Sequence, residues 1–250
     1  MQAALTMTQC AAARLALIGS ALMLFSFAAG ANTIVTYATA TGALNGTRPV
    51  SIEAIFDLGP DSIKITVTNL ENNPVDVSQG LNALAFQPTG QGMTIIQPKL
   101  NSSSSAEIYI NGDGTHSTPA PVATTSWALS TSSVAGGLPF QVCRLCNARP
   151  DQLLIGDWGA GGLYSAANGS IADNGPHNPF LYKTATFTIT GINNATGISS
   201  VIFSFGTTTG QNVPGRPEDF NAPEPGAVVL ISGGLLLLVA ARFSRRLTRV

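Results

Sequence analysis

Apolar and polar residues alternate with a period of two along much of this chain, and no other feature constrains the fold as strongly. In residues 62–68, Ile63, Ile65 and Val67 alternate with polar residues, as is typical of a half-buried β-strand. Further strands are expected at residues 33–38, 50–58, 83–87, 93–97, 107–110, 185–190 and 201–205. Outside the two ends, no stretch of 12 residues has a helical apolar stripe. The pattern predicts an all-β fold, an antiparallel β-sandwich or jelly roll.

Turn-forming residues separate these strands and are most abundant in the middle of the chain. Residues 111–180 are rich in Gly, Pro, Ser and Asn, which predicts long loops on a rigid sheet. Residues 101–105, an Asn followed by four Ser, are expected to form a solvated turn between strands. Because no shift in composition divides the region, residues 32–221 are predicted to form one exported domain.

The N-terminal 31 residues have the basic, apolar, small order of a secretory signal peptide. Arg14 precedes a 13-residue apolar run at 15–27, which is too short to span a bilayer. Ala29, Gly30 and Ala31 follow, so cleavage is expected after Ala31, with Gly30 as the other candidate. The competing interpretation is an N-terminal core helix, which would not require this order.

The C-terminal end carries a second apolar run, residues 226–241, followed by basic residues. A helix of these 16 residues would span about 24 Å, a little less than a bilayer core. A helix buried in the domain core is the alternative, but it would carry periodic polar positions that this run lacks. The basic residues that follow are Arg242, Arg245, Arg246 and Arg249. Since basic flanks stay in the cytoplasm, they are predicted to act as membrane stop charges, with residues 32–225 exported.

The tail as a whole resembles the PEP-CTERM sorting signal. Pro223, Glu224 and Pro225 stand directly before the apolar run, and the arginine cluster ends the chain, so three ordered elements coincide over residues 222–250. The arginines are interrupted and Ala222 precedes the motif, where the family more often has an unbroken run and Val.

The resemblance implies a Gram-negative bacterium and recognition by an exosortase, a protease-like enzyme of the inner membrane. The membrane-anchored precursor would then pass to the cell surface or extracellular matrix, in association with exopolysaccharide. The two prolines would hold an extended segment, which is the form that a protease cleft accepts.

The overall charge argues against one class of partner. Charged residues are 10% of the chain, with 12 basic and 13 acidic residues for a net charge of −1. Such a balance offers no electrostatic support for nucleic-acid binding. The surface must instead be wetted by Ser, Thr, Asn and Gln, which suits an exported protein.

The pair Cys143 and Cys146 is the only C-x-x-C in the chain. Two cysteines of an exported protein usually pair, so a structural disulfide, or an idle thiol pair, is the favoured interpretation. A redox site would need a βαβ setting and a helix start, and a metal site would need two more ligands. His116 and His177 are the only histidines, and their spacing from the cysteines matches no zinc finger. No metal and no cofactor are therefore predicted.

Catalytic motifs are likewise not found. The chain has neither the Gly-x-Ser-x-Gly nucleophile elbow nor His-Glu-x-x-His, so no catalytic residue is assigned. Asp151, Asp157 and Asp173 lie in expected loops and are the candidates for paired carboxylates of a glycosidase. The loops 111–114 and 173–175 could supply oxygens to Ca²⁺, although turns favour Asn, Asp and Gly for backbone reasons alone.

Two function classes remain open. The first is a non-catalytic surface or matrix protein, and the second is an exported enzyme acting on extracellular glycans. Sugar-stacking rings could serve either class. The candidates are Trp127, Trp158, Tyr164 and Tyr182. The glycine-rich surroundings of Trp158 could present it to a glycan, whereas packing over the end of the sandwich is the simpler interpretation. The three aspartates and Trp158 would have to converge in a cleft to favour the enzyme.

Overall fold

The computed structural model describes residues 32–123, 125–132, 134–147 and 149–218. The expected signal peptide with Ala31, the Pro-Glu-Pro motif, the span 226–241 and the arginine cluster lie outside these residues. Within the described ranges, no helix is long and apolar enough to cross a bilayer. The described residues up to Arg216 belong to one compact unit.

Nearly all regular structure in the described residues is β-strand, and the helices there are single 3₁₀ turns. The all-β prediction is therefore confirmed. The strands are β1 (Thr33–Thr39), β2 (Leu44–Asn45), β3 (Arg48–Pro49), β4 (Ile52–Leu58), β5 (Ser62–Asn69), β6 (Leu81–Thr89), β7 (Thr94–Ile108), β8 (Ala120–Val122), β9 (Ala128–Ser130), β10 (Phe140–Cys143), β11 (Leu154–Ile155), β12 (Phe180–Tyr182), β13 (Thr184–Asn193), β14 (Gly197–Phe205) and β15 (Asn212–Glu218). The 3₁₀ turns are η1 (Val77–Gln79), η2 (Ala135–Gly137) and η3 (Leu145–Asn147).

The strands form one large, strongly bent sheet, together with a separate β2–β3 pair. The order of its main path is β11-β12-β7-β13-β5-β4-β1-β15-β14-β6-β10-β9, with β8 beside β7. An additional pairing joins β11 to β6, so the sheet folds back on itself. Strand pairing is antiparallel in the described registers except between β11 and β12, which run parallel. The first and last strands, β1 and β15, are neighbours in this order.

The period-two pattern places one face of each long strand in the core. In β5, Ile63, Ile65 and Val67 are fully buried, while the polar residues between them are wholly or partly exposed. The neighbouring β13 repeats the pattern, and its Phe187 lies opposite Ile65. Burying such branched and aromatic side chains is the main favourable contribution to folding.

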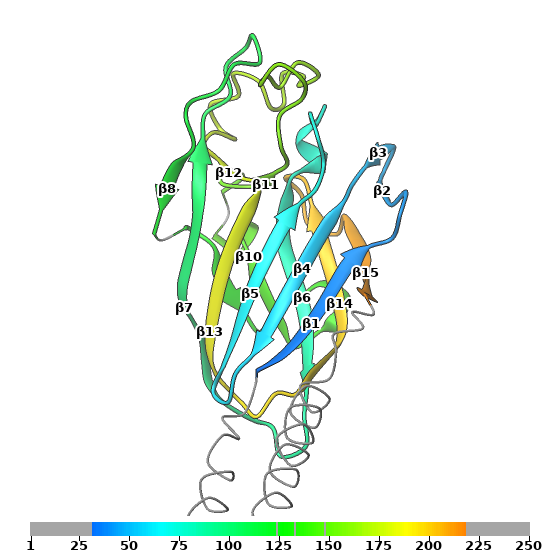
Figure 1. Cartoon of the computed structure of the whole chain (residues 1–250), viewed down its shortest axis with the longest axis vertical. Coiled ribbons are helices and arrows are strands. Elements are labelled where there is room, and N and C mark those ends of the chain that lie inside the picture. The colour runs from blue at the N-terminus through cyan, green and yellow to red at the C-terminus, as the bar shows by residue number, and fades with distance from the viewer. Residues whose placement is uncertain (1–31, 124, 133, 148, 219–250) are drawn as a thin grey trace, which may run out of the picture. The chain divides into compact units, whose positions relative to one another are not determined.

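The core lies between two layers of the bent sheet. Ring centroids of Phe56 in β4 and Phe86 in β6 are 5.6 Å apart, although no register pairs these strands directly. The Tyr37 hydroxyl of β1 donates to the Ile198 carbonyl of β14 at 2.7 Å. Figure 1 shows β1, β4 and β5 crossing in front of β6, β10 and β14. The arrangement is sandwich-like.

The segment 111–180 is poor in long strands, as its composition predicts, but its loops are not loosely held. A second apolar cluster packs beneath them, separate from the main core. Its buried members are Val77, Ile108, Ile110, Leu153, Ile155, Tyr164, Ile171, Ala172 and Phe180. The loops between residues 153 and 180 therefore rest on a core of their own, whereas Trp127, Phe140 and Val142 of the same segment pack into the main core.

The prediction of a solvated turn at residues 101–105 is wrong. Strand β7 runs without interruption from Thr94 to Ile108, and Ser102, Ser103 and Ser104 pair with residues of β13. Ser103 is buried, and its Oγ accepts hydrogen bonds from the backbone N–H and the hydroxyl of Thr125. The ladder to β13 and these bonds outweigh the weak intrinsic preference of serine for strands.

Candidate functional site

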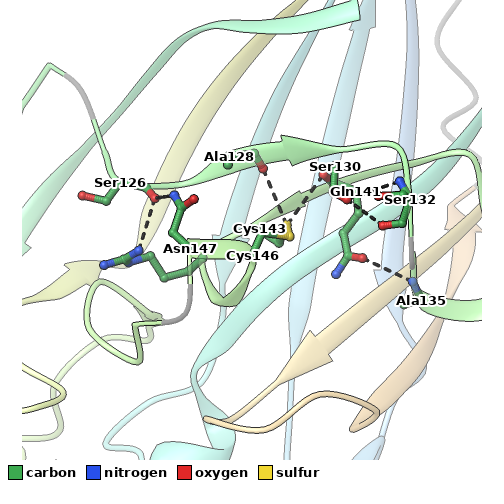
Figure 2. The surroundings of a disulfide bond; sticks show 10 residues. Ser126, Ala128, Ser130, Ser132, Ala135, Gln141, Cys143, Cys146 and Asn147 are labelled. Atoms are coloured by element: carbon green, nitrogen blue, oxygen red, sulfur yellow. Dashed lines mark hydrogen bonds between the residues drawn. A yellow bond between two sulfur atoms is a disulfide. The ribbon is translucent and has the colours of Figure 1, made fainter.

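Cys143 and Cys146 are joined in a disulfide on one edge of the sandwich-like fold (Figure 2). Cys143 ends β10 and is buried, whereas Cys146 lies in η3 and is exposed. Their Cα atoms are 5.5 Å apart. The single 3₁₀ turn that holds Cys146 is not the α-helix N-terminus on which a thioredoxin-like site depends.

A groove of about 550 Å³ opens beside this disulfide. Its lining comes from the outward positions of neighbouring strands, where Gln141 and Cys143 alternate with the core residues Phe140 and Val142. The residues that line it are Asn82, Ser130, Ser132, Val134, Ala135, Gly136, Gln141, Cys143, Leu145, Cys146, Ser204, Thr209, Gly210 and Asn212. None of these carries a charge, so the groove is neutral, and its polar side chains are amides and hydroxyls.

Two nearly buried polar side chains belong to this lining. Asn82 is 2% exposed, and its Nδ2 donates to the Gly206 carbonyl at 2.8 Å. Its Oδ1 accepts no hydrogen bond from the described residues. Ser204 is 3% exposed, and its hydroxyl donates to Asn212 Oδ1 at 2.7 Å.

The side-chain amide of Gln141 is held in one orientation by a backbone contact. Its Oε1 accepts from the backbone N–H of Ala135 at 3.2 Å, and Figure 2 shows the side chain pointing toward Ala135, the first residue of η2. Because the backbone can only donate here, the amide orientation is determined, and Nε2 is left without a partner among the described residues. Nearby, Ser130 Oγ donates to the Ser132 carbonyl at 2.7 Å.

The groove is continued by a second cavity. This cavity, about 380 Å³, shares Leu145 and Thr209 with the groove and is also lined by Pro150, His177 and Thr207. The Nδ1 atom of His177 lies 2.6 Å from the Ser170 carbonyl.

The buried side chain of Arg144 holds the turn that carries the disulfide. Its side chain is 2% exposed and forms an ion pair with Asp151, and its Nη1 donates to the Ser126 carbonyl at 3.3 Å. The same carbonyl accepts a hydrogen bond from Asn147 Nδ2 at 2.7 Å, as Figure 2 shows. The turn 143–147 is therefore fastened to the segment that leads into β9.

The three candidate aspartates do not form a common site. Asp151 pairs with Arg144, while Asp157 accepts hydrogen bonds from the Tyr182 hydroxyl and Lys183 Nζ, both at 2.7 Å. Asp173 is exposed, and no hydrogen bond or ion pair joins it to the other two.

The pKa of Asp157 reflects its partners. Burial alone would raise this pKa, but the hydrogen bonds from Lys183 and Tyr182 and the charge of Lys183 lower it below its usual range. The pKa of Tyr182 is raised by burial and by its hydrogen bond to Asp157. Asp157 therefore stays ionised, and a glycosidase acid with a raised pKa is not what this position provides.

Trp158 does not present a free ring face. It stacks on His116 with ring centroids 4.1 Å apart, and on Tyr182 with centroids 4.7 Å apart. Two parallel rings that stack on one indole without contacting each other lie on its opposite faces. Tyr164 is buried and meets Trp158 edge-on, and Trp127 is buried against Phe187. These rings pack with one another and with the core.

In the 111–114 loop considered for Ca²⁺, the carboxylate is occupied by local hydrogen bonds. Asp113 Oδ1 accepts from both the backbone N–H and the hydroxyl of Thr115, at 3.0 and 2.6 Å. These bonds lower the pKa of Asp113. No group of three or more His, Cys, Asp or Glu side chains in the described part of the chain is arranged to hold a metal.

Reasoning from the sequence did not single out Asn82, Gln141, Ser204 or Asn212. The one available signal was that positions 141 and 143 share a face of a short alternating strand. No family model matches the chain, and neither a curated protein nor a solved structure matches it. The groove and the tail are therefore the features from which a function can be argued.

Proposed function

We propose that this chain is a non-catalytic, exported cell-surface or extracellular-matrix protein of a Gram-negative bacterium, sorted through a PEP-CTERM signal and associated with exopolysaccharide. In this proposal residues 1–31 are a signal peptide cleaved after Ala31. Residues 32–221 form a jelly-roll-like antiparallel sandwich, and residues 222–250 are the sorting signal.

The observation that carries the proposal is the order of three elements at the C-terminal end of the sequence. Pro223, Glu224 and Pro225 would be read by an exosortase, residues 226–241 would hold the precursor in the inner membrane, and the arginines would keep its end in the cytoplasm. Each element performs a separate physical task. Their succession in 29 residues is difficult to obtain by composition alone.

Features of the described domain support export. The Cys143–Cys146 disulfide suits an oxidising compartment such as the periplasm or the cell exterior. The low content of charged residues suits a surface wetted by hydroxyl and amide groups. Both features would be less usual in a cytosolic enzyme.

The basic partners of two of the three candidate aspartates support a non-catalytic role. Asp151 and Asp157 are each held by a basic partner, and the rings near Asp157 are packed against one another. Held in this way, they would act as structural ion pairs rather than as an acid and a nucleophile flanking a glycan. The alternative of an exported glycan-acting enzyme gains no specific support from these contacts.

The proposal is tested by expressing the full chain in a Gram-negative host with an intact exosortase and in the same host without it. The N- and C-terminal residues of surface-exposed protein are then determined by mass spectrometry. The expected surface form begins at residue 32 and lacks the arginine cluster only where the exosortase is present. Surface protein that retains residues 242–250 in the intact host would contradict the sorting proposal.

A further inference from the structure

We infer that the groove beside the disulfide binds an uncharged, hydroxyl-bearing chain, a segment of neutral polysaccharide. The inference deepens the proposed function and rests on it only in placing such a glycan outside the cell. The volume of about 550 Å³ lies within the range of ~300–1,000 Å³ common for small-molecule sites.

The unpartnered polar atoms of the groove are of both kinds. Gln141 Nε2 offers two N–H donors, while Asn82 Oδ1 is an acceptor on a side chain that is 98% buried. The orientation of both amides is determined by backbone partners, the Ala135 N–H and the Gly206 carbonyl. A ligand must therefore both donate and accept hydrogen bonds, and a hydroxyl group does both.

Charged ligands fit these groups poorly. A carboxylate or phosphate only accepts when ionised, so it would leave Asn82 Oδ1 facing an anion. A cation would face the Gln141 amide hydrogens, and no acidic side chain lines the groove to neutralise it. An unpaired charge or polar group in such a site reduces affinity, so neutrality is a selective feature.

The presence of two neighbouring cavities favours a chain over a single sugar. Leu145 and Thr209 line both the groove and the adjoining cavity of about 380 Å³, so bound sugar units could follow one another past these two residues. The apolar faces of a sugar would contact Val134, Leu145 and the disulfide. The amides lie on strands rather than on free loops, which keeps them oriented before binding.

The experiment is isothermal titration calorimetry of the full chain with neutral tetrasaccharides: cellotetraose, laminaritetraose, maltotetraose and mannotetraose. An alginate tetrasaccharide serves as the anionic comparison. The detergent must lack a sugar head group, because a maltoside is itself a neutral glycan and would compete. We expect at least one neutral tetrasaccharide to bind, and the alginate fragment to bind at least tenfold more weakly.

The decisive variant is Gln141→Glu. It keeps the oxygen that accepts from Ala135 and replaces the Nε2 donor by a second, anionic oxygen, so the loop contact survives while the free donor is lost. We expect its dissociation constant for the neutral ligand to rise about tenfold. The matched control is Gln87→Glu, which makes the same charge change at an exposed position of β6 outside the groove and should leave binding unchanged.

A second variant guards against an indirect effect of Gln141→Glu. Asn212→Ala removes a different amide of the lining, and it should weaken the same ligand several-fold while the thermal midpoint is followed in parallel. The inference is overturned if no neutral tetrasaccharide binds, if the alginate fragment binds best, or if Gln141→Glu binds like the parent chain.

These outcomes are independent of sorting. Binding is measured with purified chain and needs no exosortase, whereas processing of the tail needs no glycan. Loss of processing with intact binding would therefore contradict the proposed function alone, and the reverse result would contradict the groove alone.

Discussion

Arg144 donates from Nε to the backbone carbonyl of Asp151 at 3.0 Å and pairs through Nη2 with the carboxylate of the same residue. The guanidinium is 2% exposed and the carboxylate 24% exposed, so the cation depends on this one anion. Arg144 follows the last residue of β10, and the disulfide partner Cys146 lies between Arg144 and Asp151. The pair therefore stabilises both the end of β10 and the turn that lines one side of the groove.

Replacing Asp151 by Ala should destabilise the domain strongly. The change leaves the Arg144 guanidinium buried without a counter-ion, and removing one partner of a buried pair costs about 3–5 kcal/mol. The free energy of unfolding is measured by urea denaturation monitored by Trp fluorescence. Asp61→Ala, at an exposed carboxylate, is the control and should change stability by no more than about 0.5 kcal/mol. Equal stability of the two variants would contradict a structural role for the pair.

Replacing Cys143 and Cys146 together by Ser should have a smaller effect. The disulfide closes a very short loop, so on chain-entropy grounds it contributes at most about 2 kcal/mol. Secretion should be retained, because the main core does not depend on the cross-link. Thermal unfolding of the variant, compared with the parent under oxidising conditions, measures the difference. A loss of bound metal in the variant, detected by elemental analysis, would count against a purely structural disulfide.

Stability should fall on acidification partly through Asp157. Its pKa is lowered in the folded state, so its contribution is present above the unfolded pKa of about 3.9 and is lost as the pH falls through the folded value. Asp157→Asn should therefore be less stable than the parent near neutral pH but should approach it once the pH falls below the folded pKa of Asp157. Urea midpoints from pH 6 to pH 2 test this, and parallel curves for the two proteins would refute it.

Replacing Arg242, Arg245, Arg246 and Arg249 by Gln should release unprocessed precursor. Each arginine resists transfer into the hydrocarbon by about 2.5–3.5 kcal/mol, so without them the 16-residue run has no stop. Cell fractionation would then find the chain, with residues 222–250 still attached, in the soluble exported fraction. A variant that stays in the membrane would show that the arginines are not the stop.

Replacing Glu224 by Ala should have the opposite effect. The helix and its stop charges survive, but the segment that the exosortase reads is altered, so the precursor should remain anchored and uncleaved. Immunoblotting of membrane fractions checks this, with Glu218→Ala, just upstream of the motif, as the control. If the Glu224 and arginine variants are both processed like the parent, the tail is a simple anchor.

The sequence predicted best what depends on neighbouring residues alone. The alternation of Ile63, Ile65 and Val67 predicted β5, because the two faces of a strand are determined by a local period. The prediction from sequence failed for the four serines of β7, where pairing with β13 and Thr125 overrides the local preference of serine for turns. It also missed the groove. Asn82 meets Gly206 across 124 positions of sequence, and no local pattern reports such a contact.

The adjacency of β1 and β15 has a consequence for the order in which the sheet is completed. In the proposed export β1 crosses the membrane first and can pair early with β4, but its other neighbour, β15, is the last of the described strands to follow. Until then the free edge of β1, with Ile34 exposed, can pair with the same edge of another incompletely folded chain. A chain truncated before β15 should therefore aggregate even though nearly all of its core residues are present.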